Sequence, residues 1–284
     1  MKRHASTIIL VAVFLVGLSL LLYPSFSDWW NSLHQTRVVA SYMGAVTDLN
    51  NDEYNQIWED AREYNADLAA KPINYVLSDE ESALYNQLLN VSGDGVMGYV
   101  EIPRIHVKLP VFHGTDEETL QVAIGHIAGS SLPTGGPGTH CVISGHTGLP
   151  RARLFTDINQ LSVGDTFTLN VLDEVLTYEV DQIRIVLPYE LDNLSIEEGK
   201  DYCTLVTCTP YGINTHRLLV RGHRVETKSS NTVRVTADAL QIEPTLVAVI
   251  IAVPMLLILI FVVLITSGIR RKHNHRRGTG TDEE

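Results

Sequence analysis

The chain has 284 residues, 45% of them hydrophobic, and a formal net charge of −12. This length suits one domain of ordinary size with accessory segments, and the apolar content is enough for a full core. The two terminal tails hold seven of the 21 Lys and Arg residues but only three of the 33 Asp and Glu residues, so the portion between them is strongly acidic. Such a charge argues against nucleic acid as a partner.

The first predicted element is a membrane anchor over residues 1–27. An apolar run, residues 8–22, follows a basic start. The alternative is a cleaved signal peptide, because the run is short and its flank is basic. The segment "YPSFSDWW" has no clean small-x-small cleavage site, and its paired Trp29 and Trp30 suit a membrane interface, so an uncleaved anchor is favoured.

Residues 28–92 are predicted to form a helical extension that includes a possible lid region. Between residues 36 and 70, apolar side chains recur at spacings of three and four with acidic residues between them, which is typical of an amphipathic helix. This helix is expected either to pack on the domain or to serve as a stalk.

After Gly93 the pattern changes to short apolar runs separated by Gly, Pro and Asp, which predicts a β-barrel or sandwich over residues 93–227. The runs are "MGYVEIP", "VKLPVF", "THCVISGH", "TFTLNVL", "LTYEVDQIRIVLP", "YCTLVTC" and "HRLLVRGHR".

The C-terminal part is predicted to cross the membrane a second time. A linker over residues 228–243 leads to an apolar helix over residues 244–268, which is long enough to span about 30 Å of hydrocarbon. The tail over residues 269–284 is rich in Arg and Lys, so the positive-inside rule places both termini in the cytoplasm and the middle of the chain outside the cell.

Cys208 is the first candidate for chemistry. It follows "TLVT" and precedes Thr209 and Pro210, where a strand is expected to end because proline cannot donate to the ladder. A cysteine at this place faces a loop rim. The alternative is a structural half-cystine or a buried free thiol.

Arg217 is expected to return beside Cys208. The loop "TPYGINTH" contains the turn formers Gly212 and Asn214, so the run "RLLVRG" doubles back along "TLVTC". An arginine there can promote thiolate formation and donate hydrogen bonds to an oxyanion when the thiolate attacks a carbonyl.

His146 is the preferred general base among eleven histidines. The glycines that flank it in "VISGHTGLP" mark a strand end, so its ring can project into a cleft walled by loops. His216 adjoins Arg217 but is expected to point to the opposite face. Four others are best explained as ordinary strand or loop residues: His113, His126, His140 and His223.

These motifs together resemble the sortase family of cysteine transpeptidases, in particular the class C, pilin-polymerising sortases. The resemblance is carried by "TLVTCTPYGINTHRLLVRGHR", "GTHCVISGHTGLPRARLF", "MGYVEIPRIHVKLPVFHGT" and "GHIAGSSLPTGGPGTH", over residues 54–224. It implies a mainly β fold, an eight-stranded sortase barrel with an N-terminal helical extension and a transmembrane helix at each end. It also implies Cys208 as nucleophile, His146 as general acid and base, and Arg217 as the oxyanion- and substrate-binding residue.

The implied reaction is acyl transfer at the surface of a Gram-positive bacterium, without cofactor or metal. The enzyme would cleave an LPxTG-like sorting signal of a pilin or other surface protein after its Thr and form a thioacyl enzyme. A lysine amine of another pilin would then resolve this intermediate into an isopeptide bond, with enzyme and substrate both held by membrane lipid.

One expected feature of class C is missing from the sequence. Class C sortases often carry a lid with an Asp-Pro-aromatic motif, but the corresponding region reads "AAKPINYVLSDEESALYNQLLN". Tyr75 is the candidate for a substitute aromatic plug.

Cys141 and Cys203 each lie five residues before a predicted catalytic residue. If His146 and Cys208 end neighbouring parallel strands, the two cysteines are neighbours on the opposite face, because an odd offset reverses the side. A disulfide between them is possible outside the cell. Parallel-strand geometry is poor for a disulfide, so two buried reduced thiols are favoured.

Three other functions are alternatives to this one. A zinc site lacks any CxxC or HxxxH ligand spacing. A non-catalytic membrane-bound adhesin or scaffold would not need Cys208, His146 and Arg217 to converge. A housekeeping sortase that anchors proteins to the cell wall, or a hydrolase that uses water, would keep the enzyme but change the acceptor.

Overall fold

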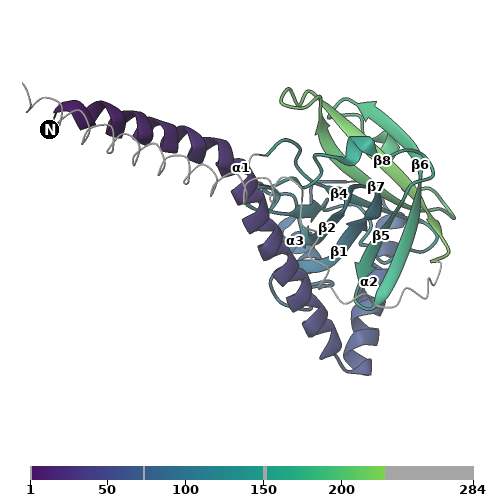
Figure 1. Cartoon of the computed structure of the whole chain (residues 1–284). Helices are drawn as coiled ribbons and strands as arrows, with labels where there is room; N and C mark the ends of the chain where they lie inside the picture. Colours follow the sequence, from purple (N-terminus) through teal and green to yellow (C-terminus); the bar gives the residue numbers. More distant parts are fainter. Residues whose placement is uncertain (1, 73, 150–151, 228–284) are drawn as a thin grey trace, which may run out of the picture. The chain divides into compact units, whose positions relative to one another are not determined.

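Eight β-strands close into a barrel, which confirms the predicted fold class (Figure 1). Around the barrel the strands follow the order β1-β2-β3-β4-β7-β8-β6-β5. Their bounds are β1 (Val96–Ile102), β2 (Val107–His113), β3 (Ile124–His126), β4 (Thr139–Ser144), β5 (Thr166–Val171), β6 (Glu174–Val186), β7 (Asp201–Thr209) and β8 (His216–Val225).

The computed structural model describes residues 2–72, 74–149 and 152–227. The predicted linker, C-terminal membrane helix and basic tail, residues 228–243, 244–268 and 269–284, therefore lie outside the described residues. They stay predictions from the sequence.

Two strand pairs, β2 with β3 and β4 with β7, are parallel, and the other pairs are antiparallel. Parallel neighbours need a long crossover, which β5 and β6 provide between β4 and β7. The carboxyl ends of β4 and β7 consequently lie side by side at one rim of the barrel, where the two predicted catalytic loops begin.

Side chains alternate between the barrel interior and its outer face. Cys141, Ile143, Cys203, Leu205 and Val220 belong to the main buried core. Their neighbours in sequence point to the other side, because successive side chains of a strand face opposite ways. This alternation separates the residues that stabilise the barrel from those that are available at its outer face.

The helices pack outside the barrel. Before the first strand come α1 (Lys2–Thr47), α2 (Asn51–Ala69) and α3 (Asp79–Tyr85), and the one-turn α4 (Glu117–Leu120) lies between β2 and β3. Three 3₁₀ turns occur in the connections: η1 (Pro103–Ile105), η2 (Ile158–Gln160) and η3 (Asp192–Leu194). Where one helical pattern was predicted over residues 36–70, the chain turns at residues 48–50, because Asn50 caps a new helix through a capping box with Glu53.

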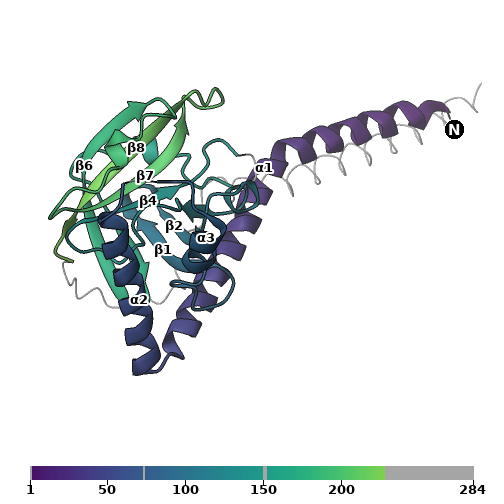
Figure 2. The same cartoon turned by 180° about the vertical axis from the view of Figure 1, so that it is seen from behind.

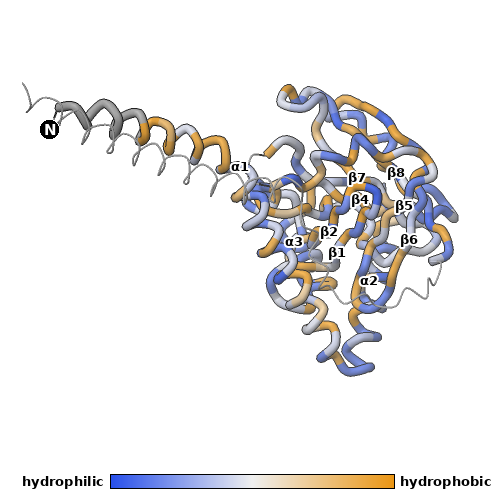
Figure 3. Tube along the Cα trace, in the orientation of Figure 1, coloured by the Kyte–Doolittle hydropathy of each residue, from blue (hydrophilic) through white to orange (hydrophobic). Residues whose placement is uncertain are grey.

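Helix α1 has two parts. Its N-terminal part projects away from the barrel and its second part runs beside the barrel (Figures 1 and 2). Where Figure 3 colours the projecting part, in the turns nearer the barrel, it is predominantly hydrophobic. Among the described residues, Val13–Thr47 is the one helix long and apolar enough to cross a membrane. The helix continues unbroken through the boundary predicted between residues 27 and 28.

The second part of α1 is fixed to the barrel by buried contacts. Val39 and Tyr42 are almost fully buried. The Tyr42 hydroxyl donates to the carbonyl of Met97 (3.2 Å) and accepts from the amide of Leu172 (2.7 Å). The second part of α1 is thereby an integral part of the barrel domain.

Candidate active site

Cys208 and Arg217 are directly opposite each other on β7 and β8. The chain reverses through residues 210–215, where the amides of Ile213 and Asn214 both donate to the carbonyl of Pro210. Gly212 and Asn214 adopt the left-handed conformation, which suits their residue types. The predicted return of Arg217 to Cys208 is therefore confirmed, and both side chains are half-buried.

His146 lies just beyond the end of β4, on the strand that runs parallel to β7. The last pair of that ladder is Ser144 with Val206. Two further bonds extend the contact: the Gly145 amide donates to the Val206 carbonyl (3.0 Å), and the Thr207 hydroxyl donates to the Gly145 carbonyl (2.6 Å). Continuing this register by two residues sets position 146 beside position 208.

The His146 side chain is not fully satisfied by hydrogen bonds within the described part of the protein, as is typical of a residue that contacts a ligand. The His146 ring is half-buried, and its Nε2 atom is buried without a hydrogen-bond partner among the described residues. A buried polar atom without a partner is costly in a stable protein, so such atoms are concentrated at functional sites.

The loops after β4 and after β7 touch each other. A Cβ atom added at Gly148 would lie 2.9 Å from the ring of Tyr211. Gly148 also has a φ of +75°, so a side chain there would meet both strain and collision. The loop that carries His146 and the loop that follows Cys208 thus form one rim.

An apolar patch lies next to the catalytic positions on the outer face of the barrel. We call it the apolar floor; its members are Val142, Val186, Leu194, Val206 and Leu219. Val206 and Leu219 are paired with each other, two positions from the Cys208 and Arg217 pair and on the same face. An extended peptide at Cys208 would therefore lie along this floor.

Tyr75 already packs on the apolar floor. Its hydroxyl donates to the carbonyl of Leu194 (3.3 Å), and burial raises the pKa of Tyr75 to about 12, so the hydroxyl keeps its proton at neutral pH. The segment that carries it crosses the barrel closely: a Cβ atom at Gly129 would lie 2.2 Å from the carbonyl oxygen of Asn74. The structure places the Tyr75 ring on the apolar floor, and its role as a plug over Cys208 stays a prediction.

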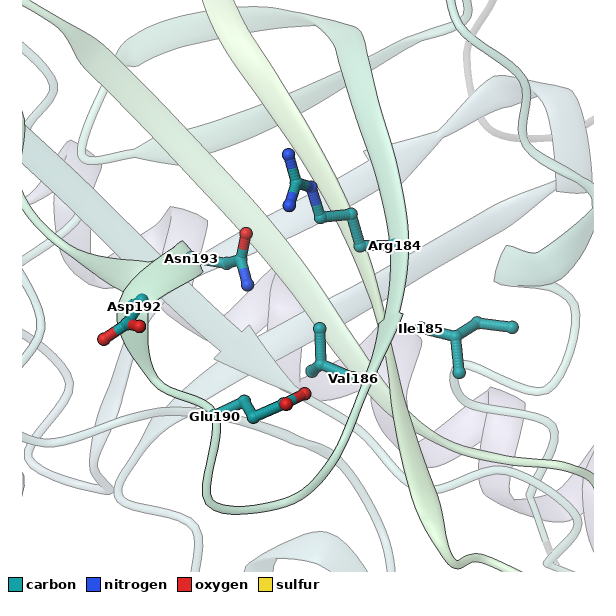
Figure 4. Close-up of a pocket in the computed structure, with 6 residues that line it drawn as sticks. All are labelled: Arg184, Ile185, Val186, Glu190, Asp192 and Asn193. Atoms are coloured by element: carbon teal, nitrogen blue, oxygen red, sulfur yellow. The ribbon is translucent and has the colours of Figure 1, made fainter.

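An open hollow of about 530 Å³ adjoins the apolar floor on the β6 side. Figure 4 shows its lining, which comes from the end of β6 and from the β6–β7 connection: Arg184, Ile185, Val186, Glu190, Asp192 and Asn193. Val186 belongs to the floor and is paired with Arg217 on β8. The hollow is not predictable from the sequence, because the β6–β7 connection has no motif of its own.

The buried histidines have structural hydrogen bonds, in line with their interpretation as ordinary strand residues. His126 contacts the Tyr85 hydroxyl and the Ser131 carbonyl. His140 contacts the Ser195 carbonyl and the Thr204 hydroxyl, and His113 contacts the carbonyls of Gly95 and Leu88. Each ring links two separate segments of the chain.

Cys141 and Cys203 are directly paired on β4 and β7, as the sequence register predicts. Both are free, and both are buried in the barrel interior, on the face opposite Cys208. Burial and the neighbouring Cys141 raise the pKa of the Cys203 thiol well above its usual value. A disulfide between them stays a prediction. In residues 2–72, 74–149 and 152–227, no cluster of three His, Cys, Asp or Glu side chains could hold a metal ion.

Comparison with known proteins decides the family. Residues 100–225 match the family model described as "Sortase domain". Sortase C1 from Streptococcus agalactiae is 50% identical to this chain, with a TM-score of 0.66, and the match covers 67% of this chain and 99% of that structure. The chain belongs to the sortase family. Sortases are cysteine transpeptidases, and the similarity to a sortase C1 places this one in class C.

Two further sortases illustrate the range of similarity. Sortase C from Clostridium perfringens, solved with the C-terminal cell wall sorting motif, is 41% identical, with a TM-score of 0.60, over 68% of this chain and 100% of that structure. Sortase D from Bacillus subtilis is 30% identical over 131 residues, which are 45% of this chain and 63% of that protein. The sortase thus matches class C relatives over nearly their whole length and this more distant relative over less than two thirds of its length.

Proposed function

We propose that this sortase cleaves an LPxTG-like sorting signal after its Thr and joins the product to a lysine amine of another pilin subunit. The observation that carries the proposal is the pairing of Cys208 with Arg217, next to the end of the strand that leads into His146. The class C similarity supports pilins as substrates, and the sorting motif bound by the Clostridium perfringens relative supports the signal.

The first half of the reaction is acylation. The Cys208 thiolate attacks the Thr carbonyl of the signal, and Arg217 donates hydrogen bonds to the oxyanion that develops. His146 in its protonated form gives a proton to the leaving amine of the next residue. The peptide bond breaks, the C-terminal fragment leaves, and a thioester joins the Thr to Cys208.

The second half transfers the acyl group. An incoming lysine amine attacks the thioester and gives its proton to His146, which is thereby recharged for the next cycle. The carbon–sulfur bond breaks, an isopeptide bond forms, and Cys208 leaves as thiolate. No oxidant, reductant or cofactor takes part in these steps.

The apolar floor is proposed to bind the apolar residues at the start of the signal. Its β7 member, Val206, lies two residues before Cys208, and all its members are aliphatic side chains, which suit Leu and Pro. Because Tyr75 packs on the same floor, the signal and the Tyr75 ring compete for it. Tyr75 is therefore proposed as a removable cover of the floor. It would do this as a single aromatic side chain, although the chain lacks the Asp-Pro-aromatic motif.

Membrane attachment is proposed to hold this active site at the cell surface. The projecting, apolar part of α1 is the one helix among the described residues that could cross a membrane. The outward orientation and the cytoplasmic position of both termini rest on the charges at the two ends of the sequence. Tethering enzyme and substrate to one membrane raises their effective concentration.

Mass spectrometry tests the proposal. Wild-type and Cys208→Ala proteins are incubated with an LPxTG-containing peptide and a lysine-bearing acceptor. The expected result is an acyl adduct on Cys208 that passes to the lysine, and neither species in the variant. If neither the wild type nor a Tyr75→Ala variant, which lacks the proposed cover, forms an adduct, Cys208 is not the nucleophile for this signal and a scaffold role is favoured.

The acceptor is identified by the size of the products in cells. Covalent polymers of high mass that disappear in the Cys208→Ala strain support pilin assembly. Single attachment of surface proteins to peptidoglycan instead supports the housekeeping alternative.

A further inference from the structure

Helix α1 makes a contact that the proposed mechanism does not use. It reaches residues 152–157, which return toward His146. The described residues 146–149 and 152–157 are here called the His146 loop. We infer that Asp28 of α1 is a positioning residue for His146: its carboxylate holds the returning arm of this loop against the barrel. The inference rests on the proposed function in so far as His146 is the general acid and base.

The returning arm of the His146 loop is bonded to the histidine itself. The amide of Phe155 donates to the carbonyl of His146 (3.1 Å). One residue later, the hydroxyl of Thr156 accepts from the amide of Gly148 (3.1 Å). The backbone that follows the His146 side chain is therefore bonded to residues 155 and 156.

Asp28 fixes the same arm from outside. Its Oδ1 atom accepts a hydrogen bond from the backbone amide of Arg153 (2.9 Å), two residues before Phe155. An amide that donates to a carboxylate makes a stronger bond than one that donates to a neutral oxygen. Asp28 and the carbonyl of His146 thus accept hydrogen bonds from two amides of the arm that are two residues apart, those of Arg153 and Phe155.

The helix can hold this contact because it is itself fixed. Gln35, Val39 and Tyr42 follow Asp28 at spacings of seven, four and three, so all four side chains lie on one stripe of α1. Gln35 donates to the carbonyl of Val122 (2.9 Å), and Val39 and Tyr42 are buried against the barrel. The burial of Val39 and Tyr42 fixes α1 below Asp28 and so defines where its carboxylate lies, whereas the Gln35 bond is at the exposed surface.

Asp28 also adjoins the membrane-facing part of the helix. Phe26, Trp29 and Trp30 surround it in sequence, their rings contact one another, and all three are exposed. Aromatic side chains of this kind are enriched at membrane–water interfaces. The Asp28 contact therefore links the membrane boundary of the enzyme to its catalytic loop, and it makes α1 a part of the active-site scaffold as well as an anchor.

The test uses the full chain in phospholipid nanodiscs. Asp28→Ala removes the acceptor, Asp28→Asn keeps an oxygen that can accept the Arg153 amide, and Gln35→Ala removes a neighbouring bond between α1 and the barrel without touching the His146 loop. Two quantities are measured: kcat and KM with an LPxTG peptide, and the pH profile of Cys208 alkylation by iodoacetamide, with His146→Ala as reference.

We expect Asp28→Ala to lower kcat about ten-fold with little change in KM, because a charge-assisted hydrogen bond is lost away from the substrate. Its alkylation profile should move toward that of His146→Ala. Asp28→Asn should recover part of the loss, because its amide oxygen still accepts the Arg153 amide in a weaker, neutral hydrogen bond. Gln35→Ala should resemble the wild type. A purely structural contact would change the thermal stability but leave the alkylation profile in place.

Three results would overturn the inference: a wild-type kcat and profile for Asp28→Ala, an equal loss in Gln35→Ala, or no recovery in Asp28→Asn. If the wild type does not turn over the peptide at all, the proposed function fails. The alkylation comparison still decides whether Asp28 positions the His146 loop, so the two failures are distinguishable.

Discussion

Replacing Tyr75 by Ala should activate the enzyme. A half-buried tyrosine ring removes on the order of 100 Å² of apolar surface from water, which contributes about 2.5 kcal/mol. The hydrogen bond from its hydroxyl to the Leu194 carbonyl (3.3 Å) adds about 0.5 kcal/mol, at the weak end of the usual range. Loss of about 3 kcal/mol of closed-state stability shifts the opening equilibrium by about 100-fold.

The assay is the initial rate of LPxTG-peptide cleavage at low substrate, where kcat/KM includes the cost of removing the cover. The Tyr75→Ala variant should show a raised kcat/KM, up to the point where the cover is mostly open. Tyr75→Phe is the matched control, since it keeps the ring and loses only the hydroxyl, and it should gain no more than about three-fold.

A second variant, Gly129→Ala, tests the same segment by displacing the backbone of Asn74 and Tyr75. A Cβ atom at Gly129 would collide with the Asn74 carbonyl oxygen, so Gly129→Ala must displace the backbone next to Tyr75. It should raise kcat/KM in the same direction as Tyr75→Ala. If both variants cleave the peptide at the wild-type rate or more slowly, while still folded, Tyr75 does not compete with the signal.

Three further predictions concern the catalytic pair, the buried histidines and the interior cysteines. Arg217→Lys should lower kcat by roughly 100-fold, because a point charge cannot replace the guanidinium fork at the oxyanion, while Cys208 still reacts with iodoacetamide. Burial lowers the pKa of both His113 and His140, so below pH about 6.5 the unfolded chain binds more protons and the free energy of unfolding falls. The melting temperature should therefore drop from pH 7.5 to pH 5.5, and by less in His140→Gln; an equal drop in both proteins would contradict this origin. Iodoacetamide labelling of the denatured, unreduced protein should modify all three cysteines if Cys141 and Cys203 are reduced, and Cys208 alone if they form a disulfide.

Much of the candidate site follows from local rules. A proline after Cys208 ends its strand, the turn formers Gly212 and Asn214 reverse the chain, and the period of a strand then decides that Arg217 faces the cysteine. These rules act over about ten residues and need no knowledge of the whole fold. The pairing of Cys208 with Arg217 is therefore predictable from the sequence.

Other parts of the structure depend on contacts that leave no local pattern. The strand β3 has only three residues and was missed, because alternation cannot be recognised over so short a run. The bond between Asp28 and Arg153 joins residues 125 positions apart. The position of Tyr75 on the apolar floor likewise depends on how residues 70–78 cross the barrel, which no propensity determines.

The proposal of Cys208 as nucleophile combines an offset read from the sequence with the burial seen in the structure. Cys203 and Cys208 lie on one strand, but their offset of five residues places them on opposite faces. Cys203 is fully buried in the core beside Cys141, whereas Cys208 is half-buried at the outer face, where the strand ends. Only a thiol that a peptide can approach can attack it. The alternation of side chains along the strand therefore places Cys208 on the accessible face. The closed barrel shields the other two cysteines of the sequence, Cys141 and Cys203, from solvent, so Cys208 is the one we expect to react.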